Sequence, residues 1–132
     1  MKADRYRYDD HDRPDLRDLP THAGVDKDCR EEIEEKTAEN IETMKELQDA
    51  LYADGREGIV IVLQAMDAAG KDSTIKHVMS GLNPQGGMEH SFKQPGAEEL
   101  AHDYLWRVVQ HLPPRGSIAI FNRSHYEDVL AV

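Results

Sequence analysis

The sequence predicts an α/β fold in which helices cover a parallel β-sheet, and three observations support this prediction. Residues Ile59–Leu63 form a continuous apolar, β-branched run, which is typical of a parallel strand buried on both faces. A turn of small residues follows, and residues 72–79 then have a helical pattern. A second apolar run, over residues 117–121, repeats the strand signal after another helical stretch. Strands that alternate with helices along a chain favour a parallel sheet with helices on its faces.

The region before the first strand divides into a charged arm and a helix. Residues 1–25 are charged, contain proline and have few apolar side chains, so we expect an extended or disordered arm. Over residues 28–51, apolar side chains recur at helical spacing, which predicts an amphipathic helix that packs on the sheet and ends near Gly55. The members of this apolar stripe are Ile33, Ile41, Met44, Leu47 and Leu51.

The second half of the chain contains a loop, a candidate third strand and one more helix. Residues 80–87 are rich in Gly, Asn and Pro and predict a loop, after which residues 88–92 are a possible strand. Residues 98–112 predict a helix that two prolines stop before the strand over residues 117–121. The apolar face of this helix consists of Leu100, Tyr104, Leu105, Val108, Val109 and Leu112.

The turn after the first strand predicts a phosphate-binding loop. Gly70 and Lys71 stand between an apolar strand and a helix start, where backbone N–H groups, the helix dipole and a lysine favour phosphate. The common pattern G-x-x-x-x-G-K-[ST] is only partly met, because Ala65 replaces the first glycine and Asp72 replaces the hydroxyl residue. Asp67 lies inside the loop, where a carboxylate would repel phosphate unless a cation lies between them, so it argues for Mg²⁺.

Several residues of this region are candidate phosphate or nucleotide ligands. They are Ala68, Ala69, Gly70, Lys71, Asp72, Ser73, Lys76 and Lys93. For Lys76 and Lys93 a solvated lysine is the alternative interpretation. For the loop as a whole, the alternative is an ordinary strand–turn–helix connection with a solvated Asp and Lys.

Polar residues also follow the second strand, at the sheet edge where ligands bind in open α/β folds. Arg123 can donate a pair of hydrogen bonds to phosphate oxygens, while Asn122 and Glu127 can hold a metal or its waters. The alternative is a polar strand-to-helix connection in which Ser124 caps a helix.

Five blocks of the sequence, in order, resemble the family-2 polyphosphate kinases, and most closely their class III branch, which phosphorylates nucleoside mono- and diphosphates. The blocks are MDAAGKDSTIKHVMSGLNPQG (66–86), SFKQP (91–95), EELAHDYLWR (98–107), LPPRG (112–116) and FNRSHYEDVL (121–130). The resemblance covers about residues 26–132. It implies a P-loop kinase-like three-layer fold with a parallel sheet.

The resemblance also implies roles for individual residues. Asp67 corresponds to the loop carboxylate that organises Mg²⁺ and phosphate, Lys71 to the phosphate-binding lysine, and Arg123 to a phosphate contact after the second strand. These three are the expected catalytic residues, and Asp67, Asn122 and Glu127 are the expected metal ligands. Asn122 stands where many relatives have Asp, similar to the class III form. Ala65 departs from the family's usual glycine.

The activity implied is transfer of a phosphoryl group between inorganic polyphosphate and a nucleoside mono- or diphosphate, with Mg²⁺ as cofactor and AMP, ADP or ATP as the nucleotide. An ATP-dependent nucleoside monophosphate kinase, which shares the first loop, is one alternative, although the block FNRSHYED favours the polyphosphate enzyme. A catalytically incomplete fragment that binds phosphate or only self-associates is the other alternative.

The family's catalytic domain continues with further strands and a helical lid that carries basic residues. We therefore expect residues 26–132 to be the N-terminal part of that domain, truncated after the second strand, with the lid and the C-terminal part absent. We also expect the chain alone to be inactive and to form a homo-oligomer through unpaired sheet edges.

The charge distribution excludes one class of partner. The net charge is −10, and residues 1–57 hold ten basic against 18 acidic residues while residues 58–132 hold six against eight. No basic stripe with interleaved aromatic residues is present, so we expect no nucleic-acid partner. No stretch resembles a signal peptide or approaches membrane-spanning length, and Cys29 is the single cysteine. We expect a cytoplasmic protein without a membrane partner.

Overall fold

A computed structural model describes residues 14–19 and 29–127 of the chain. The chain divides into two compact units, residues 1–38 and residues 39–132. In the first unit, a short 3₁₀ helix, η2 (Leu16–Asp18), is described, and Arg17 pairs with Asp15. The rest of the predicted arm lies outside the described residues. No helix in the described part of the chain is long and apolar enough to cross a membrane.

The helix α1 (Cys29–Asp54) continues from the first unit into the second. Side-chain pairs one turn apart support it, such as the ion pair between Arg30 and Glu34. It ends where predicted, because Gly55 adopts a left-handed conformation with φ of 61° and its N–H bonds to the Leu51 carbonyl.

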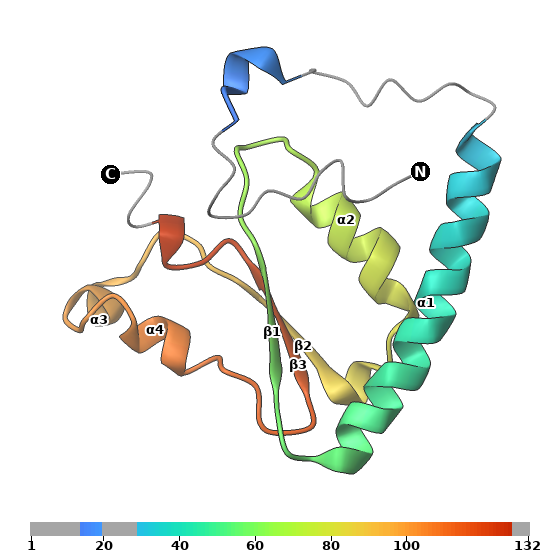
Figure 1. Cartoon of the computed structure of the whole chain (residues 1–132). Coiled ribbons are helices and arrows are strands. Elements are labelled where there is room, and N and C mark those ends of the chain that lie inside the picture. The colour runs from blue at the N-terminus through green and yellow to red at the C-terminus, as the bar shows by residue number, and fades with distance from the viewer. Residues whose placement is uncertain (1–13, 20–28, 128–132) are drawn as a thin grey trace. The chain divides into compact units, whose positions relative to one another are not determined.

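A three-stranded parallel sheet forms the centre of the second unit (Figure 1). Its strands are β1 (Ile59–Leu63), β2 (Gly87–Ser91) and β3 (Ile118–Asn122), in the order β1-β3-β2. All three predicted strands are therefore confirmed. The parallel register brings Leu63 of β1, Asn122 of β3 and Ser91 of β2 to the same edge.

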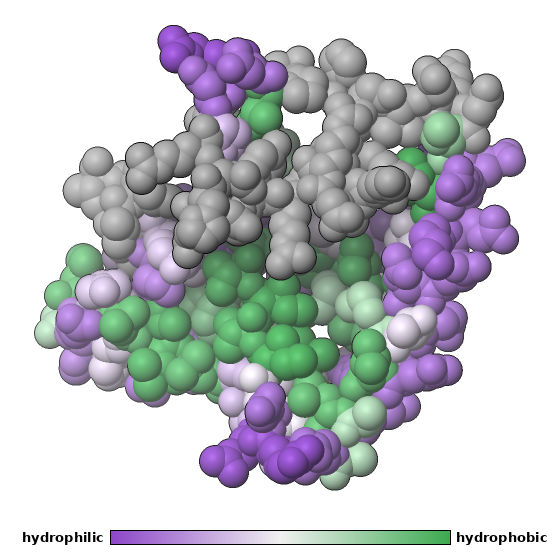
Figure 2. All heavy atoms as spheres, in the orientation of Figure 1, coloured by the Kyte–Doolittle hydropathy of each residue, from purple (hydrophilic) through white to green (hydrophobic). Residues whose placement is uncertain are grey.

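The central strand is β3, and it is buried along its whole length. The first strand was predicted to be buried on both faces, and this is wrong. Among the described residues β1 pairs only with β3, so it is an edge strand, and Ile59 keeps 44% of its surface exposed. Figure 2 shows apolar side chains gathered over this part of the sheet.

Helices cover both faces of the sheet (Figure 1). On one face, Ile75 of α2 (Lys71–Val78) packs with Ile118 and Ile120, and Leu51 of α1 packs against this cluster. On the other face, Val108 packs with Phe92, Ala119 and Phe121. Side chains alternate between the faces of β3, so this one strand supplies both clusters.

The predicted helix over residues 98–112 is in fact two short helices, α3 (Ala97–Leu100) and α4 (Trp106–Val109). Asp103 interrupts it, because its carboxylate accepts a hydrogen bond from the Leu105 N–H at 2.9 Å and its carbonyl accepts one from the Trp106 N–H. Of the predicted apolar face only Val108 is buried.

A glutamine of α1, and not the neighbouring leucine that the sequence pattern predicts, is buried against the rest of the second unit. Leu47, which the helical pattern placed in the core, is 63% exposed, whereas Gln48 is only 3% exposed. The Gln48 side chain donates to the Asn83 carbonyl at 2.9 Å and accepts from the Asn83 N–H at 2.8 Å. Gly86 leaves room for it, since a Cβ there would lie 2.8 Å from Gln48 Nε2. Gln48 thus fixes the loop that leads into β2.

We predict that Gln48→Leu lowers the free energy of unfolding by about 1–3 kcal/mol, because it leaves the two main-chain groups of Asn83 without their partner. Chemical denaturation measures the change. Gln85→Leu, the same substitution at an exposed position of the same loop, is the control and should stay within about 0.5 kcal/mol of the parent. A Gln48→Leu protein as stable as the control would contradict the role of this contact.

Two histidines on the α4 side of the sheet are stacked. The rings of His90 and His111 lie 3.4 Å apart between centroids at an interplanar angle of 18°. Burial lowers the pKa of His90 below its usual 6.5, the charges of His111 and Arg107 lower it further, and Glu99 acts in the opposite direction. The folded protein therefore favours the neutral form of His90.

This depressed pKa predicts that stability is lost as the pH falls below about 6.5, because the unfolded chain then binds a proton that the folded chain resists. Thermal unfolding between pH 5 and pH 8 tests this. His90→Gln should flatten the dependence, and His77→Gln, at an exposed position of α2, should leave it unchanged. An identical pH dependence in the parent and in His90→Gln would contradict the prediction.

Candidate functional site

The loop between β1 and α2 has the backbone geometry that a phosphate-binding loop requires. Ala68 and Gly70 both have positive φ, of 61° and 91°. Gly70 directly precedes α2, and its carbonyl accepts the Thr74 N–H at 2.9 Å to close the first turn. The N–H groups at this end of α2 have no partners within the helix, and the helix dipole adds positive potential there. The conformation of the loop is compatible with phosphate binding, and its role stays a prediction.

Lys71, the first residue of α2, folds back over the loop. Its ammonium group donates to the carbonyls of Ala65 at 2.7 Å and Met66 at 2.9 Å. These bonds hold a full positive charge at the loop's mouth. Ala65, the departure from the usual glycine, supplies one of the two carbonyls and is not among the residues that line the cleft described below.

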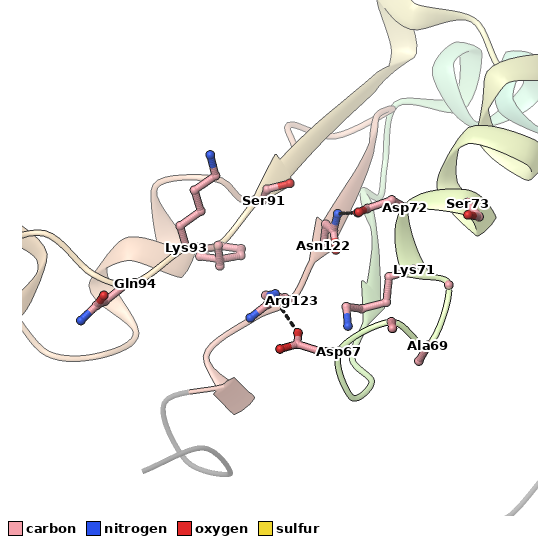
Figure 3. Close-up of a pocket in the computed structure, with 13 residues that line it drawn as sticks. Asp67, Ala69, Lys71, Asp72, Ser73, Ser91, Lys93, Gln94, Asn122 and Arg123 are labelled. Atoms are coloured by element: carbon pink, nitrogen blue, oxygen red, sulfur yellow. Dashed lines mark hydrogen bonds and ion pairs between the residues drawn. The ribbon is translucent and has the colours of Figure 1, made fainter.

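The end of β3 contacts the loop through two side-chain bonds (Figure 3). The Asn122 amide donates to Asp72 at 2.6 Å, which ties β3 to the first turn of α2. The Arg123 guanidinium bonds to Asp67 at 2.7 Å and to Glu127 at 2.9 Å. Arg123 has a φ of 68°, which is uncommon for a residue with a side chain and is often found at functional sites.

A cleft of about 780 Å³ lies between the phosphate loop and the segment that follows β2. In Figure 3, Lys71 and Asp67 come from the loop side, Asn122 and Arg123 from β3, and Lys93 from beyond β2. The lining consists of Asp67, Ala68, Ala69, Gly70, Lys71, Asp72, Ser73, Ser91, Phe92, Lys93, Gln94, Asn122 and Arg123. The structure therefore brings most of the predicted site residues together.

Two predicted residues lie elsewhere. Lys76 is on an exposed part of α2 and lines a separate cavity of about 360 Å³ that contains none of the phosphate-loop residues. Glu127 does not line the cleft but holds Arg123, and its other carboxylate oxygen accepts a hydrogen bond from Gln64. The roles of both residues stay predictions.

Three cleft residues, Ser91, Phe92 and Gln94, were not singled out from the sequence. All three belong to the block SFKQP (91–95), which begins in the last two residues of the predicted third strand. Because the carboxyl ends of parallel strands meet at one edge, this strand end was a usable signal for them.

The cleft carries both signs of charge. Lys71, Lys93 and Arg123 face it together with Asp67 and Asp72. Within residues 14–19 and 29–127, no three acidic, histidine or cysteine side chains are grouped closely enough to hold a metal by themselves. Asp67 and Asp72 are nevertheless oxygen donors of the kind that Mg²⁺ prefers, and Mg²⁺ is often held by one or two carboxylates plus substrate phosphates. The donor set fits such a phosphate-bridged ion.

Comparisons with known proteins identify the family of the chain. Residues 27–132 match the family described as Polyphosphate kinase 2 (PPK2). The ADP-polyphosphate phosphotransferase of Rhodopseudomonas palustris is 45% identical over 132 residues, which is 100% of this chain and 46% of that protein. The AMP/ADP-polyphosphate phosphotransferase of Meiothermus ruber is 56% identical over 89 residues, which is 67% of this chain and 33% of that protein. The chain spans less than half the length of these relatives.

Solved structures show the same likeness. The crystal structure of Polyphosphate Kinase 2 from Arthrobacter aurescens TC1 superposes with a TM-score of 0.68 and 40% identity, covering 70% of this chain and 34% of that one. A putative polyphosphate kinase 2 from Pseudomonas aeruginosa gives a TM-score of 0.62 and 31% identity, over 80% of this chain and 22% of that one. The fold is the predicted P-loop kinase-like α/β fold, and the chain belongs to the polyphosphate kinase 2 family.

Proposed function

We propose that this chain provides the phosphate-binding part of an enzyme that moves a phosphoryl group between inorganic polyphosphate and a nucleoside mono- or diphosphate. The observation that supports it best is the cleft in which the loop before α2, Lys71 and Arg123 lie together. The substrates follow from the relatives, which are named ADP-polyphosphate and AMP/ADP-polyphosphate phosphotransferases.

In this proposal the loop and Lys71 grip one phosphate group. Lys71 is already held at the loop's mouth by the carbonyls of Ala65 and Met66, so little side-chain freedom is lost on binding. The N–H groups at the start of α2 add donors that require no rearrangement. Such preorganised charge stabilises a transition state more than flexible charge does.

Arg123 is the second cation, and its charge is balanced in this structure by Asp67 and Glu127. Asp67 is 87% exposed, so it is free to turn toward a cation. Asp67 would hold Mg²⁺, and the ion would neutralise charge on the phosphate oxygens. Arg123 presents donors to phosphate while Glu127 orients it.

The chemistry asked of these residues is positioning and charge stabilisation. Phosphoryl transfer needs an in-line arrangement of the attacking and leaving oxygens, with cations around the group in flight. Lys71 and Arg123 provide two such cations, and Lys93, on the segment beyond β2, also lines the cleft. No covalent intermediate on the protein is required.

We predict that a chimera in which residues 1–132 replace the aligned segment of the Rhodopseudomonas palustris enzyme transfers phosphate from polyphosphate to AMP or ADP in the presence of Mg²⁺. Separation of the nucleotide products measures the transfer, and the unaltered R. palustris enzyme is the control. A folded chimera that accepts only ATP as the phosphate donor would contradict the proposal and favour a nucleoside monophosphate kinase.

In the same chimera, we predict that Lys71→Ala and Asp67→Asn each lower kcat by about 10²–10³-fold, because each removes a charge that acts on the transition state. Arg115→Ala is the control, since Arg115 is an exposed cation that does not line the cleft. It should retain kcat within about threefold of the parent. Near-normal turnover in Lys71→Ala or Asp67→Asn, with the fold intact by circular dichroism, would rule out the assigned role.

A further inference from the structure

Arg107 is a buried charged residue that lies behind the wall of the cleft. It belongs to α4, its side chain is only 8% exposed, and it does not line the cleft itself. Isolated buried charge is costly, so an arginine in this position needs partners that hold it. Its partners are informative because they all belong to, or contact, the segment between β2 and α3.

Two contacts join Arg107 directly to this segment, and a third joins it to Glu99 of α3, which also contacts the segment. Its Nη2 donates to the Lys93 carbonyl at 2.7 Å, and its guanidinium carbon lies 5.1 Å from the centroid of the Phe92 ring. Its Nε lies 3.2 Å from Glu99 Oε1. The other oxygen of Glu99 accepts the Gly96 N–H at 2.7 Å. Arg107 and Glu99 therefore hold the segment at both of its ends.

The segment they hold is also the wall of the cleft. Phe92, Lys93 and Gln94 line the cleft opposite the phosphate loop. Phe92 is fixed by the core, since it packs edge-on against Phe121 at 5.0 Å and its N–H bonds to the Asn122 carbonyl. Beyond Phe92 the chain leaves the sheet, and Arg107 and Glu99 supply its next side-chain contacts.

We propose that Arg107 is a positioning residue: with Glu99 it fixes residues 92–96 so that Lys93 faces the phosphate-binding cleft, without itself touching the phosphate chain. This inference rests on the proposed function, because it takes the ligand of the cleft to be a chain of phosphates. A neutral apolar residue could fill the same space but could not hold the Lys93 carbonyl and Glu99 at once.

A direct role for Arg107 is the competing explanation, and the structure offers a way to separate the two. Arg107 lines a neighbouring cavity of about 460 Å³ that shares Phe92, Lys93, Gln94 and Arg123 with the cleft. If Arg107 acted on an anion only through its charge, removal of the Glu99 carboxylate would tighten anion binding. If Arg107 acts by positioning, the same removal would weaken binding, because the segment is released.

The test is calorimetric titration of the 132-residue chain with tripolyphosphate in Mg²⁺. We expect Glu99→Gln, Arg107→Gln and Lys93→Ala each to weaken binding about three- to tenfold. This is the effect expected when the contact between one exposed cation and the phosphate chain is lost. Combined with Lys93→Ala, neither Glu99→Gln nor Arg107→Gln should weaken binding further. Arg107→Lys, which keeps the charge, should recover only part of the affinity.

Tighter or unchanged tripolyphosphate binding in Glu99→Gln would overturn the proposal. So would a double variant, Lys93→Ala with Glu99→Gln or with Arg107→Gln, that binds more weakly than Lys93→Ala alone. Thermal unfolding of each variant separates lost affinity from lost structure, and Glu99→Gln is the mildest change. If the parent chain binds no tripolyphosphate, the proposed function fails. Amide hydrogen exchange then still tests whether Arg107 and Glu99 hold residues 92–96 in place. Exchange at Lys93, Gln94 and Gly96 should be faster in Arg107→Gln, and unchanged exchange would overturn the proposal.

Discussion

The parallel pairing of β1 with β3 is the interaction on which the candidate site depends. It places Leu63 opposite Asn122, and the ladder continues one step further because the Arg123 N–H bonds to the Leu63 carbonyl at 3.0 Å. The two strands therefore end side by side. The loop that follows β1 and the polar residues that follow β3 meet only because of this register, and a slip of one residue would turn Asn122 away from Asp72.

The charges at this edge are balanced within the protein. Arg123 lies between Asp67 and Glu127, and Lys71 lies against two carbonyls. A polyanion that enters the cleft competes with Asp67 for Arg123, so its binding there is an exchange of contacts rather than a simple gain. Ala68 in the phosphate loop and Arg123 after β3 both have positive φ values. The surrounding structure therefore holds the backbone in a sparsely populated conformation at each of these two positions.

The sequence alone was sufficient for the strands and for most of the site, because both depend on local patterns. Apolar runs marked β1 and β3, residues 88–92 were a possible third strand, and the small-residue turn before Lys71 marked the loop. The exposure of β1 and the burial of Gln48 were not predictable in this way, since they depend on which strand is central and on a contact with Asn83, 35 residues away. The helix over residues 98–112 was mispredicted because its apolar spacing outweighed the capping tendency of Asp103. The contact between Arg107 and the Lys93 carbonyl gives no signal in a single sequence, because one of its partners is a main-chain group.

The most direct test of the central claim is a titration of the isotopically labelled chain with tripolyphosphate and Mg²⁺, followed by the backbone amide signals in NMR spectra. If the phosphate loop is the binding site, the largest shifts will fall on Ala68 to Ser73 and on Arg123, with smaller shifts at Lys93. Shifts that are largest around Lys76 and Met79, or along α1, would place the anion elsewhere and contradict the account.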